Sequence, residues 1–424
     1  MFFVIDIVMI KRDIYLERLI RREGNGLIKV ITGVRRCGKS FLLFNLFYNY
    51  LLGKGVPEDH IIGVALDDRR NKRLRDPDNM LSFLESKICD NKPYYIILDE
   101  VQMLREFEDV LNSCLHISNA DLYVTGSNSK FLSSDVITEF RGRGDEVRIY
   151  PLSFKEFCMG FEGSDEDAWD EYTMFGGLPF ILSCKTDEDK SSYLVNLFKS
   201  VYLSDIVERR KVRHKEELDE LTDILASAVG SFANPLKLSK TFRSVKNKNI
   251  SDKTLKNYID YLIDAFLVSK AARFDIKGKK YIGSLSKYYF EDIGLRNARL
   301  NFRQNEENHI MENIIYNELR IRGFRVDVGI IGQFGKNSEG KTIKKQLEVD
   351  FVAVKGSEKF YIQSAFYMET PEKQEQEERS LNAVGDAFKK IIVVRGNMRP
   401  RRSETGIVTM GVRIFLLDEG SMYL

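Results

Sequence analysis

Residues 33–40 read GVRRCGKS and match the pattern GxxxxGK[ST] at every fixed position. Glycines in such a loop let backbone N–H groups point at phosphate oxygens, and a helix that begins at its end adds positive potential. We expect Lys39 to reach the β- and γ-phosphates of a nucleotide, and the hydroxyl of Ser40 to bind Mg²⁺. A small tolerated residue is favoured over a reactive thiol at Cys37. The expected nucleotide contacts are Gly33, Val34, Arg35, Arg36, Cys37, Gly38, Lys39, Ser40 and Phe41.

Two acids directly follow an apolar run further along the chain. The run is 94–98, and the acids are Asp99 and Glu100. A carboxylate at the end of such a strand can hold the Mg²⁺ shell, and an adjacent glutamate can polarise water for attack on the γ-phosphate. Acids often follow strands for other reasons, but beside the loop we expect Asp99 to hold the metal shell and Glu100 to act as the base.

Small polar residues and two arginines complete the candidate catalytic set. The run 121–125 ends before Gly126, and we expect Ser127 or Asn128 to orient the attacking water, although a polar turn explains either residue equally well. Arg141 and Arg143 lie in the segment FRGRGDE. Either is a candidate for an arginine that acts on the phosphate of its own or a neighbouring subunit, and a solvated charged loop is the equal alternative.

The elements that must position these residues follow from the apolar pattern. Short apolar runs separated by helix-length segments indicate a parallel sheet buried on both faces, hence an α/β core. Residues 156–230 are expected to be helical, with a break at GGLP (176–179). The chain from 313 onwards is mixed, with a hairpin or loop expected at 332–345 and a Glu-rich helix before 391. The expected core strands are 27–32, 61–66, 94–98, 121–125 and 147–152.

Taken together, these motifs resemble an AAA-type ATPase family common in bacteria and archaea, whose members carry a C-terminal domain of unknown function. The matching segments cover nearly the whole chain, and they are GVRRCGKS, ILDE, TGSNS, GRGDEVRIYPLSFKEF, FGGLPF, LSDIVERR, SDKTLKNYIDYLIDAFLVSKAARFD, KYYFEDIGLRNA, ENIIYNELRIRGFRVDVG and LEVDFVA. The resemblance implies an AAA+ P-loop core (1–155) with sheet order 5-1-4-3-2, a helical lid (156–216), a winged-helix-like module (217–290) and an α+β domain with a PD-(D/E)xK nuclease-like fold (291–424).

A basic segment lies in the middle of a chain whose formal net charge is only +2. Residues 237–256 hold seven lysines and arginines against one acid. Ser251 is expected to cap a helix that buries Leu255, Ile259, Leu262 and Ala265. Its other face would present Lys253, Lys256 and Asn257 to DNA phosphates, as in a winged helix-turn-helix. A protein-interaction module or a merely solvated face is the alternative, and we favour it slightly.

The terminal domain carries three residues in the order of a PD-(D/E)xK core, namely Glu312, Asp350 and Gln363. In an active member, acids at such positions bind Mg²⁺, and a lysine two residues after the last acid positions the nucleophile. Here the last motif reads Gln363-Ser364-Ala365, which lacks both the acid and the lysine. We therefore predict a degenerate nuclease-like fold. Arg395, Arg399, Arg401 and Arg402 are candidates for polyanion contact, unless the Glu-rich helix pairs with them.

Composition limits the cellular setting. Five scattered cysteines and four histidines show no metal-ligand spacing, which argues against structural zinc and fits a reducing cytoplasm. No apolar stretch reaches transmembrane length, so no membrane partner is expected. The leading hypothesis is a Mg²⁺-dependent ATPase that couples ATP turnover to conformational change, with DNA, a protein or a second copy of the chain as partner. The alternatives are an ATP-gated binding switch with negligible turnover and an active Mg²⁺-dependent nuclease.

Overall fold

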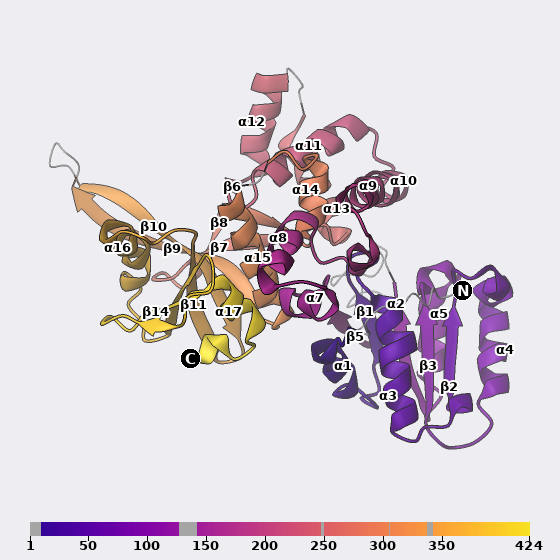
Figure 1. The fold of residues 1–424 in the computed structure, drawn as a ribbon. Helices are drawn as coiled ribbons and strands as arrows, with labels where there is room; N and C mark the ends of the chain where they lie inside the picture. The colour runs from indigo at the N-terminus through magenta and orange to yellow at the C-terminus, as the bar shows by residue number, and fades with distance from the viewer. Residues whose placement is uncertain (1–9, 127–141, 247–249, 305, 337–341) are drawn as a thin grey trace. The chain divides into compact units, whose positions relative to one another are not determined.

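The computed structural model describes residues 10–126, 142–246, 250–304, 306–336 and 342–424. The chain divides into two compact units (Figure 1). One unit comprises residues 1–152 with the short segment 178–180, and the other comprises 153–177 with 181–424.

The first unit is built on a five-stranded sheet whose strands all run parallel. The order β2-β3-β4-β1-β5 confirms the order that the family resemblance implied. The strands are β1 (Ile28–Thr32), β2 (Ile61–Ala65), β3 (Tyr94–Asp99), β4 (Ala120–Thr125) and β5 (Gly144–Arg148). The helices are α1 (Asp13–Ile20), α2 (Lys39–Phe41), the π-helix η1 (Leu42–Phe47), α3 (Tyr48–Gly53), η2 (Glu58–His60), η3 (Arg69–Arg75), α4 (Pro77–Lys87), η4 (Val101–Met103) and α5 (Phe107–Cys114).

Helices cover both faces of this sheet. Alternate strand residues point to opposite faces, and in β1 and β3 both sets of side chains are buried. On one face, Val30 packs in a cluster with Leu84 of α4 and Leu111 of α5. On the other face, the ring of Phe47 contacts the rings of Tyr95 and Tyr123. The continuous apolar runs of the sequence are therefore explained by burial on both sides.

The fifth strand differs from the expected 147–152. It comprises Gly144–Arg148 and pairs with all of β1. Its polar residues fit there because β5 is the edge strand and is paired on one side only. Beyond Ile149 the chain leaves the sheet, and the peptide N–H of Tyr150 is bonded to the hydroxyl of Tyr15 instead of to a strand. The apolar run 149–152 was wrongly assigned to the strand because it is buried outside the sheet.

The second unit begins with helices, and no strand occurs among the described residues between 153 and 231, as predicted. These helices are α7 (Phe154–Gly160), α8 (Asp165–Phe175), η6 (Pro179–Ser183, which begins in the short segment of the first unit), α9 (Asp187–Leu197), the π-helix η7 (Phe198–Leu203), α10 (Ser204–Arg209) and α11 (Lys215–Ser227). The capping box of Ser153 with Glu156 begins α7, and that of Ser164 with Asp167 begins α8.

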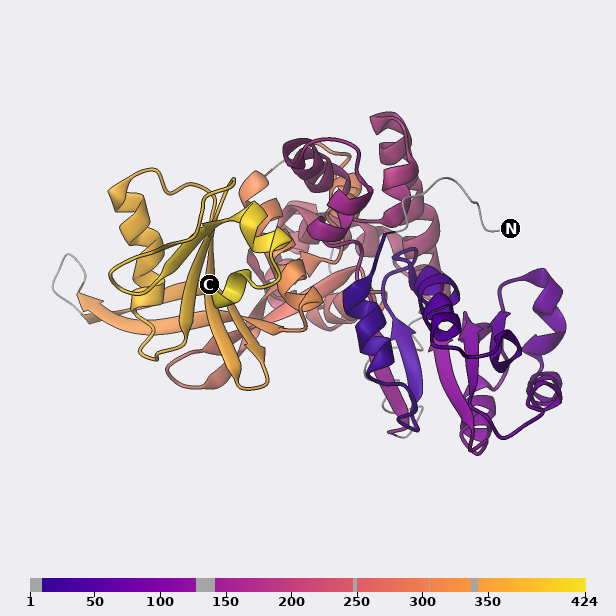
Figure 2. The ribbon, with the colours of Figure 1, turned by 60° about the horizontal axis from the view of Figure 1, so that its bottom comes forward.

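One nine-stranded sheet, of order β13-β14-β12-β11-β10-β9-β7-β8-β6, joins the rest of this unit. Figure 2 shows β9 and β10 (orange) continuing into the yellow strands of this sheet. The strands are β6 (Phe232–Ala233), β7 (Val268–Asp275), β8 (Lys280–Phe290), β9 (Arg325–Lys336), β10 (Thr342–Lys355), β11 (Glu358–Ala365), β12 (Lys389–Val394), β13 (Arg401–Arg402) and β14 (Val408–Gly411). The helices are α12 (Pro235–Lys246), α13 (Asp252–Asp264), α14 (Ile293–Arg299), α15 (Glu307–Ile321), α16 (Pro371–Asn382), α17 (Val412–Leu417) and η8 (Ser421–Tyr423).

Several expectations for this unit are confirmed. The described residues of the segment 332–345 form the two arms of a hairpin, because β9 and β10 pair antiparallel as far as Lys336 and Thr342. The Glu-rich helix is α16, and its Leu381 packs with Tyr361 and Ile392 of the sheet. On α15, Tyr316 stacks on Tyr289 of β8 and contacts Phe351 of β10. The pairing of β7 with β9 was not expected, and it makes the strands before and after residue 290 parts of one sheet.

Candidate functional site

The loop after β1 has the backbone that a phosphate-binding loop requires. Gly33 has φ +141°, and a Cβ there would lie 2.1 Å from the carbonyl oxygen of Ile149, so only glycine fits. Gly38 has φ +101° and immediately precedes α2. The helix therefore begins at Lys39, where its first N–H groups have no partner within the helix and are available to an anion.

Lys39 and Ser40 occupy the positions that the motif predicts. The side chain of Lys39 is buried, and its ammonium donates to the carbonyl oxygens of Gly33 (3.0 Å) and Val34 (3.1 Å). Ser40 lies close enough to the carboxylate of Asp99 to lower the pKa of that group. The loop and the end of β3 are thus joined through the two residues expected to share a magnesium ion.

Asp99, Glu100 and Thr125 meet at the carboxyl ends of two adjacent strands. The hydroxyl of Thr125 donates to Asp99 and accepts from the backbone N–H of Glu100 at 3.1 Å. Glu100 has φ +51°, a left-handed conformation, directly after β3. Its carboxylate is partly exposed and accepts from the side-chain amide of Gln102. Thr125 was not singled out from the sequence, although its place as the last residue of an apolar strand was the available signal.

Burial raises the pKa of the Asp99 carboxyl, and the hydrogen bonds from Thr125 and Ser40 oppose that shift. The ionised carboxylate is thus partly stabilised but lacks a full countercharge. A divalent cation beside Asp99 and Ser40 would supply this charge, and carboxylate and hydroxyl oxygens are the ligands that Mg²⁺ prefers. The donor set therefore fits the metal.

Arg12, just before α1, contacts the loop and was missed by sequence reasoning. Its buried guanidinium donates to the carbonyl oxygens of Cys37 (3.0 Å) and Tyr150 (2.8 Å). It also lies over the ring of Tyr15, 4.5 Å from the centroid. These contacts join the N-terminal segment, the loop and the chain after β5. A lone arginine in an amphipathic segment carries no pattern that would predict them.

The structure separates the remaining predicted residues. Arg35 and Arg36 in the loop and Phe41 on α2 are exposed, whereas Val34 and Cys37 are buried. The thiol of Cys37 lies 3.7 Å from the carbonyl oxygen of Ile149, consistent with a small packed residue. Ser127, Asn128 and Arg141 lie outside the described residues.

Arg143 lies at the amino-terminal end of the strands, whereas the phosphate-binding loop of the same chain lies at their carboxyl end. Its carbonyl accepts from the N–H of Ile28, the first residue of β1, whereas the loop follows the last residue of that strand. The five residues of β1 separate these two ends by about 16 Å. Its side chain donates to Asn112 at 3.3 Å. The role in its own subunit is therefore corrected, and the role in a neighbouring subunit stays a prediction.

The helix α13 has the predicted cap and faces. Ser251 accepts from the N–H of Thr254 and begins the helix. Leu255, Ile259 and Leu262 are buried, and Ala265 is half-buried. Lys253, Lys256 and Asn257 are exposed, as expected.

The structure also brings Glu312, Asp350 and Gln363 together, but around a lysine. The buried ammonium of Lys287, on β8, lies 2.8 Å from Glu312, 2.6 Å from Glu348 and 3.5 Å from Asp350. The side-chain oxygen of Gln363 accepts from the N–H of Asp350 at 3.4 Å. Lys287 was not identified from the sequence because it lies far from the motif residues along the chain.

Opposing effects set the charges in this cluster. Burial opposes the charged form of Lys287, but attraction to Glu312, Asp350 and Glu348 outweighs it and raises the lysine pKa. Burial raises the pKa of Asp350 to about 7, although Lys287 opposes the shift. Burial also opposes ionisation of Glu312, yet Lys287 and His309 outweigh it and lower its pKa. Among the described residues, no group of three His, Cys, Asp or Glu side chains is placed to hold a metal ion.

A parallel sheet of this order, with a phosphate-binding loop after β1 and an Asp-Glu pair at the end of β3, is consistent with the P-loop fold of an AAA domain. Residues 25–158 match the family described as an AAA domain, and residues 166–306 match a domain of unknown function, DUF8612. Within the part of the chain that the structure describes, no helix is both long and apolar enough to cross a bilayer.

The chain is 33% identical, over 392 residues, to an uncharacterised protein of Haemophilus influenzae, covering 91% of this chain and 93% of that protein. It belongs to the same family. An uncharacterised protein of Methanocaldococcus jannaschii is 28% identical over 405 residues, covering 92% of this chain and 84% of that protein.

Two solved structures show weak similarity. A chain from the structure of Drosophila ORC bound to AT-rich DNA and Cdc6 has 14% identity and a TM-score of 0.22, covering 68% of this chain and 91% of that chain. A DNA polymerase III gamma subunit-related protein of Thermotoga maritima has 11% identity and a TM-score of 0.24, covering 72% and 84%. Similarity this low supports no conclusion about function.

Proposed function

We propose that this chain binds Mg²⁺-ATP at the loop 33–40 and hydrolyses it to ADP and phosphate. The observation that carries the proposal is that Ser40 lies beside Asp99, that the Asp99 carboxylate accepts from Thr125, and that Thr125 accepts from the backbone N–H of Glu100. It connects Ser40 and Asp99, which must hold the metal, to Glu100, which must activate water.

Each residue has a defined task in this proposal. Lys39 exchanges its bonds to the loop carbonyls for the β- and γ-phosphates, which are stronger partners because they are charged. Ser40 and Asp99 would hold a magnesium ion, which would neutralise phosphate charge. Glu100, whose carboxylate is partly exposed, accepts a proton from the attacking water. Ser127, Asn128 and an arginine from a neighbouring subunit, Arg141 or Arg143, are proposed as further contacts.

The test compares ATP hydrolysis by the wild type, Glu100→Gln and Glu85→Gln. Glu85 is exposed on α4 and serves as the matched control. Loss of a general base is expected to lower turnover by 10²-fold or more while ATP binding remains. The Glu85→Gln variant should keep wild-type turnover. Tight ATP binding without turnover by the wild type would favour the switch alternative, and absence of Mg²⁺-ATP binding would refute the proposal.

A second proposal concerns DNA, and the topology of residues 217–290 favours it. The order α11, β6, α12, α13, β7, β8, with β8 between β6 and β7, supports the proposal that this segment is a winged helix-turn-helix. We propose that α13 contacts DNA phosphates through Lys253 and Lys256, with Asn257 beside them, and that the ATP cycle changes this contact. The helices of 156–216 are proposed as the lid that transmits the change.

The DNA proposal is tested by turnover and affinity together. Duplex DNA should raise ATP turnover of the wild type, and Lys253→Gln/Lys256→Gln should weaken duplex binding and remove that stimulation. The control is Lys211→Gln/Lys215→Gln, which removes two exposed charges outside α13. Turnover that is insensitive to DNA would instead indicate a protein partner or a second copy of the chain. A cytoplasmic location is retained as part of the proposal.

A third proposal is that the terminal domain has a nuclease-like fold that does not cleave. Lys287 supplies the positive charge that the carboxylates of Glu312 and Asp350 require, and Gln363 replaces an acid. Plasmid and single-stranded DNA should remain intact with Mg²⁺ or Mn²⁺. Cleavage that Glu312→Gln abolishes would show an active nuclease and refute this proposal.

A further inference from the structure

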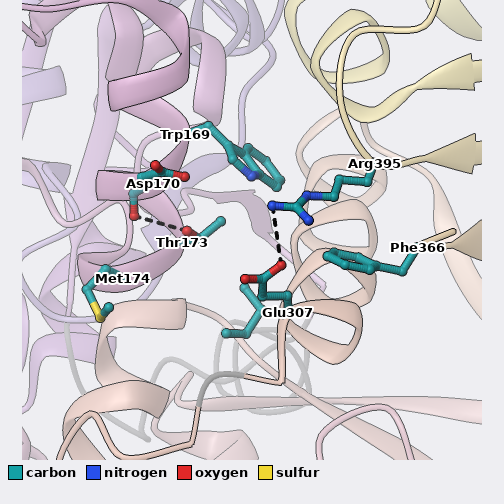
Figure 3. A pocket seen from close by; sticks show the side chains of 8 residues that line it. Trp169, Asp170, Thr173, Met174, Glu307, Phe366 and Arg395 are labelled. Carbon is teal, nitrogen blue, oxygen red and sulfur yellow. Dashed lines mark hydrogen bonds and ion pairs between the residues drawn. The ribbon is translucent and has the colours of Figure 1, made fainter.

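Two adjoining cavities lie in the second unit, and one of them borders the Gln363-Ser364-Ala365 segment of the terminal domain. One has a volume of about 400 Å³ and is lined by Trp169 and Met174 of α8, Ile310 of α15 and Phe366 after β11. The other, of about 610 Å³, is lined by Ser364, Tyr367 and Lys373. Glu307, Phe366 and Arg395 line both cavities. Figure 3 shows Trp169 and Phe366 approaching the guanidinium of Arg395 from different elements, with Glu307 beside it.

The contacts of Arg395 leave it available to a ligand. Its guanidinium lies 5.0 Å from the ring centroid of Phe366 and donates to the hydroxyl of Tyr367 at 3.1 Å. Its ion pair with Glu307 is 3.6 Å long, and both side chains are about half exposed (48% and 56%). Such exposed pairs contribute little free energy, so a phosphate could displace Glu307 at small cost.

A strip of positive charge continues from Arg395. Residues 395–402 contain four arginines and no acid, and all four are exposed. Arg401 of β13 pairs with Thr409 of β14, and Thr409 pairs with Ile392 of β12. Arg401 therefore lies two strands away from β12, at the level of Ile392, which is three residues before Arg395. That is about 10 Å in each direction. Burial lowers the pKa of Lys389, and electrostatic repulsion from Arg402 lowers it further. We call Arg395, Arg399, Arg401 and Arg402 the arginine strip.

The cavity lining itself is not positive. Glu307 pairs with Arg395, Glu377 pairs with Lys373 at 2.7 Å and Glu306 pairs with Arg296 at 4.0 Å, while Asp170 adds a further negative charge. The aromatic cavity is therefore suited to an uncharged ring, and its carboxylates can accept hydrogen bonds from an amino group on that ring. Phosphates would be held outside it, along the arginine strip.

We propose that this surface binds single-stranded nucleic acid, with one unpaired base in the Trp169–Phe366 cavity and the following phosphates on the arginine strip. A base in a duplex is already stacked and paired, so a strand must be single for one base to enter a cavity. Stacking on aromatic rings with cations along the backbone is the general chemistry of single-strand binding. This site is independent of ATP and of the contact proposed for α13.

The experiment uses the full chain without nucleotide and follows the fluorescence of Trp169, the single tryptophan of the sequence. Titration with dC12, whose bases carry an amino group, should give saturable quenching in low salt. The same titration with rC12 identifies which nucleic acid binds more tightly. Phe366→Leu should weaken binding by roughly tenfold through lost stacking. The triple variant Arg399→Gln/Arg401→Gln/Arg402→Gln should reduce the salt slope of binding by about 2.

The matched control is Lys211→Gln/Arg213→Gln/Lys215→Gln, which removes three exposed cations at the start of α11 and just before it and should bind dC12 as the wild type does. Absence of quenching would overturn the proposal. Equal affinity for an abasic strand of the same length would show a polyanion surface without a base site, and saturation by dCMP in the same range would show a mononucleotide site. Equal quenching by duplex DNA would also overturn it. None of these outcomes depends on ATP hydrolysis.

Discussion

Replacement of Arg12 by alanine tests whether this arginine holds the phosphate-binding loop. The guanidinium donates to the carbonyl oxygens of Cys37 and Tyr150, and all three groups are buried. The alanine variant leaves both carbonyls without this donor. Because the loop conformation depends on glycines that also suit other geometries, we expect the loop to lose its binding geometry before the sheet unfolds.

The magnitude follows from the contacts. A buried polar group that loses its partner costs about 1–3 kcal/mol, so two carbonyls together cost about 2–6 kcal/mol. Loss of the guanidinium from the face of the Tyr15 ring adds about 0.5–1 kcal/mol. Arg12→Ala should therefore lower the free energy of unfolding by about 3 kcal/mol or more. Arg12→Lys should recover part of this loss, because an ammonium can serve one carbonyl well but not both in the planar geometry of arginine.

The assay combines urea unfolding with Mg²⁺-ATP binding. Arg21→Ala is the matched control, because Arg21 is exposed at the end of α1 and bonds only locally to the carbonyl of Glu17 among its described contacts. It should unfold within about 0.5 kcal/mol of the wild type. Arg12→Ala should bind nucleotide at least tenfold more weakly under conditions where it is still folded. Wild-type stability and wild-type affinity in this variant would refute the reasoning.

Three further changes have defined outcomes. Gly33→Ala should abolish nucleotide binding, because its Cβ would lie 2.1 Å from the carbonyl oxygen of Ile149, whereas Gly53→Ala, with no atom within 4 Å, should bind normally; equal affinities would contradict this. Lys287→Met should lower the free energy of unfolding by about 3–5 kcal/mol in urea, because it leaves buried carboxylates without their cation; unchanged stability would mean that the cluster does not need it. The pKa of Asp350 is about 7 when folded and about 3.9 when unfolded, so its contribution to stability is fully present below about pH 4 and is lost progressively as the pH rises to about 7. Asp350→Asn should therefore reduce the fall in melting temperature between pH 5 and pH 8, and parallel curves would argue against the raised pKa.

The nucleotide loop and the core sheet could be predicted because their signals are local. The glycines at 33 and 38 are required by positive φ angles, and the helix that follows needs only its own apolar residues. Asp99 ends a strand that is buried along its whole length. In each of these cases the chemistry and the element that positions it lie within about a dozen consecutive residues, so a pattern in the sequence carries both.

Contacts between distant segments could not be predicted in this way. Lys287 meets Glu312 and Asp350 only because β8 joins the same sheet as β10, through the parallel pairing of β7 with β9. Lys287 is a single buried lysine in a strand, and no hydrophobic periodicity in the sequence marks its role. The polar strand β5 was also misplaced, because an edge strand needs burial on fewer sides than the apolar pattern assumes.

The FGG and EDIGLRNA motifs (175–177 and 291–298) show that a family resemblance can locate a contact between two segments without saying what the contact does. Asp292 accepts from the N–H of Leu295, which caps α14, and also from the N–H of Gly177 at 2.8 Å. A Cβ at Gly294 would lie 1.9 Å from the carbonyl oxygen of Phe175, and Asn297 donates to two further carbonyls of α8. Each residue of this contact is fixed by hydrogen bonding or by close approach between two backbones. These motifs therefore record the packing of α8 and the turn after it against α14, as Gly33 records the close approach of the loop 33–40 to Ile149.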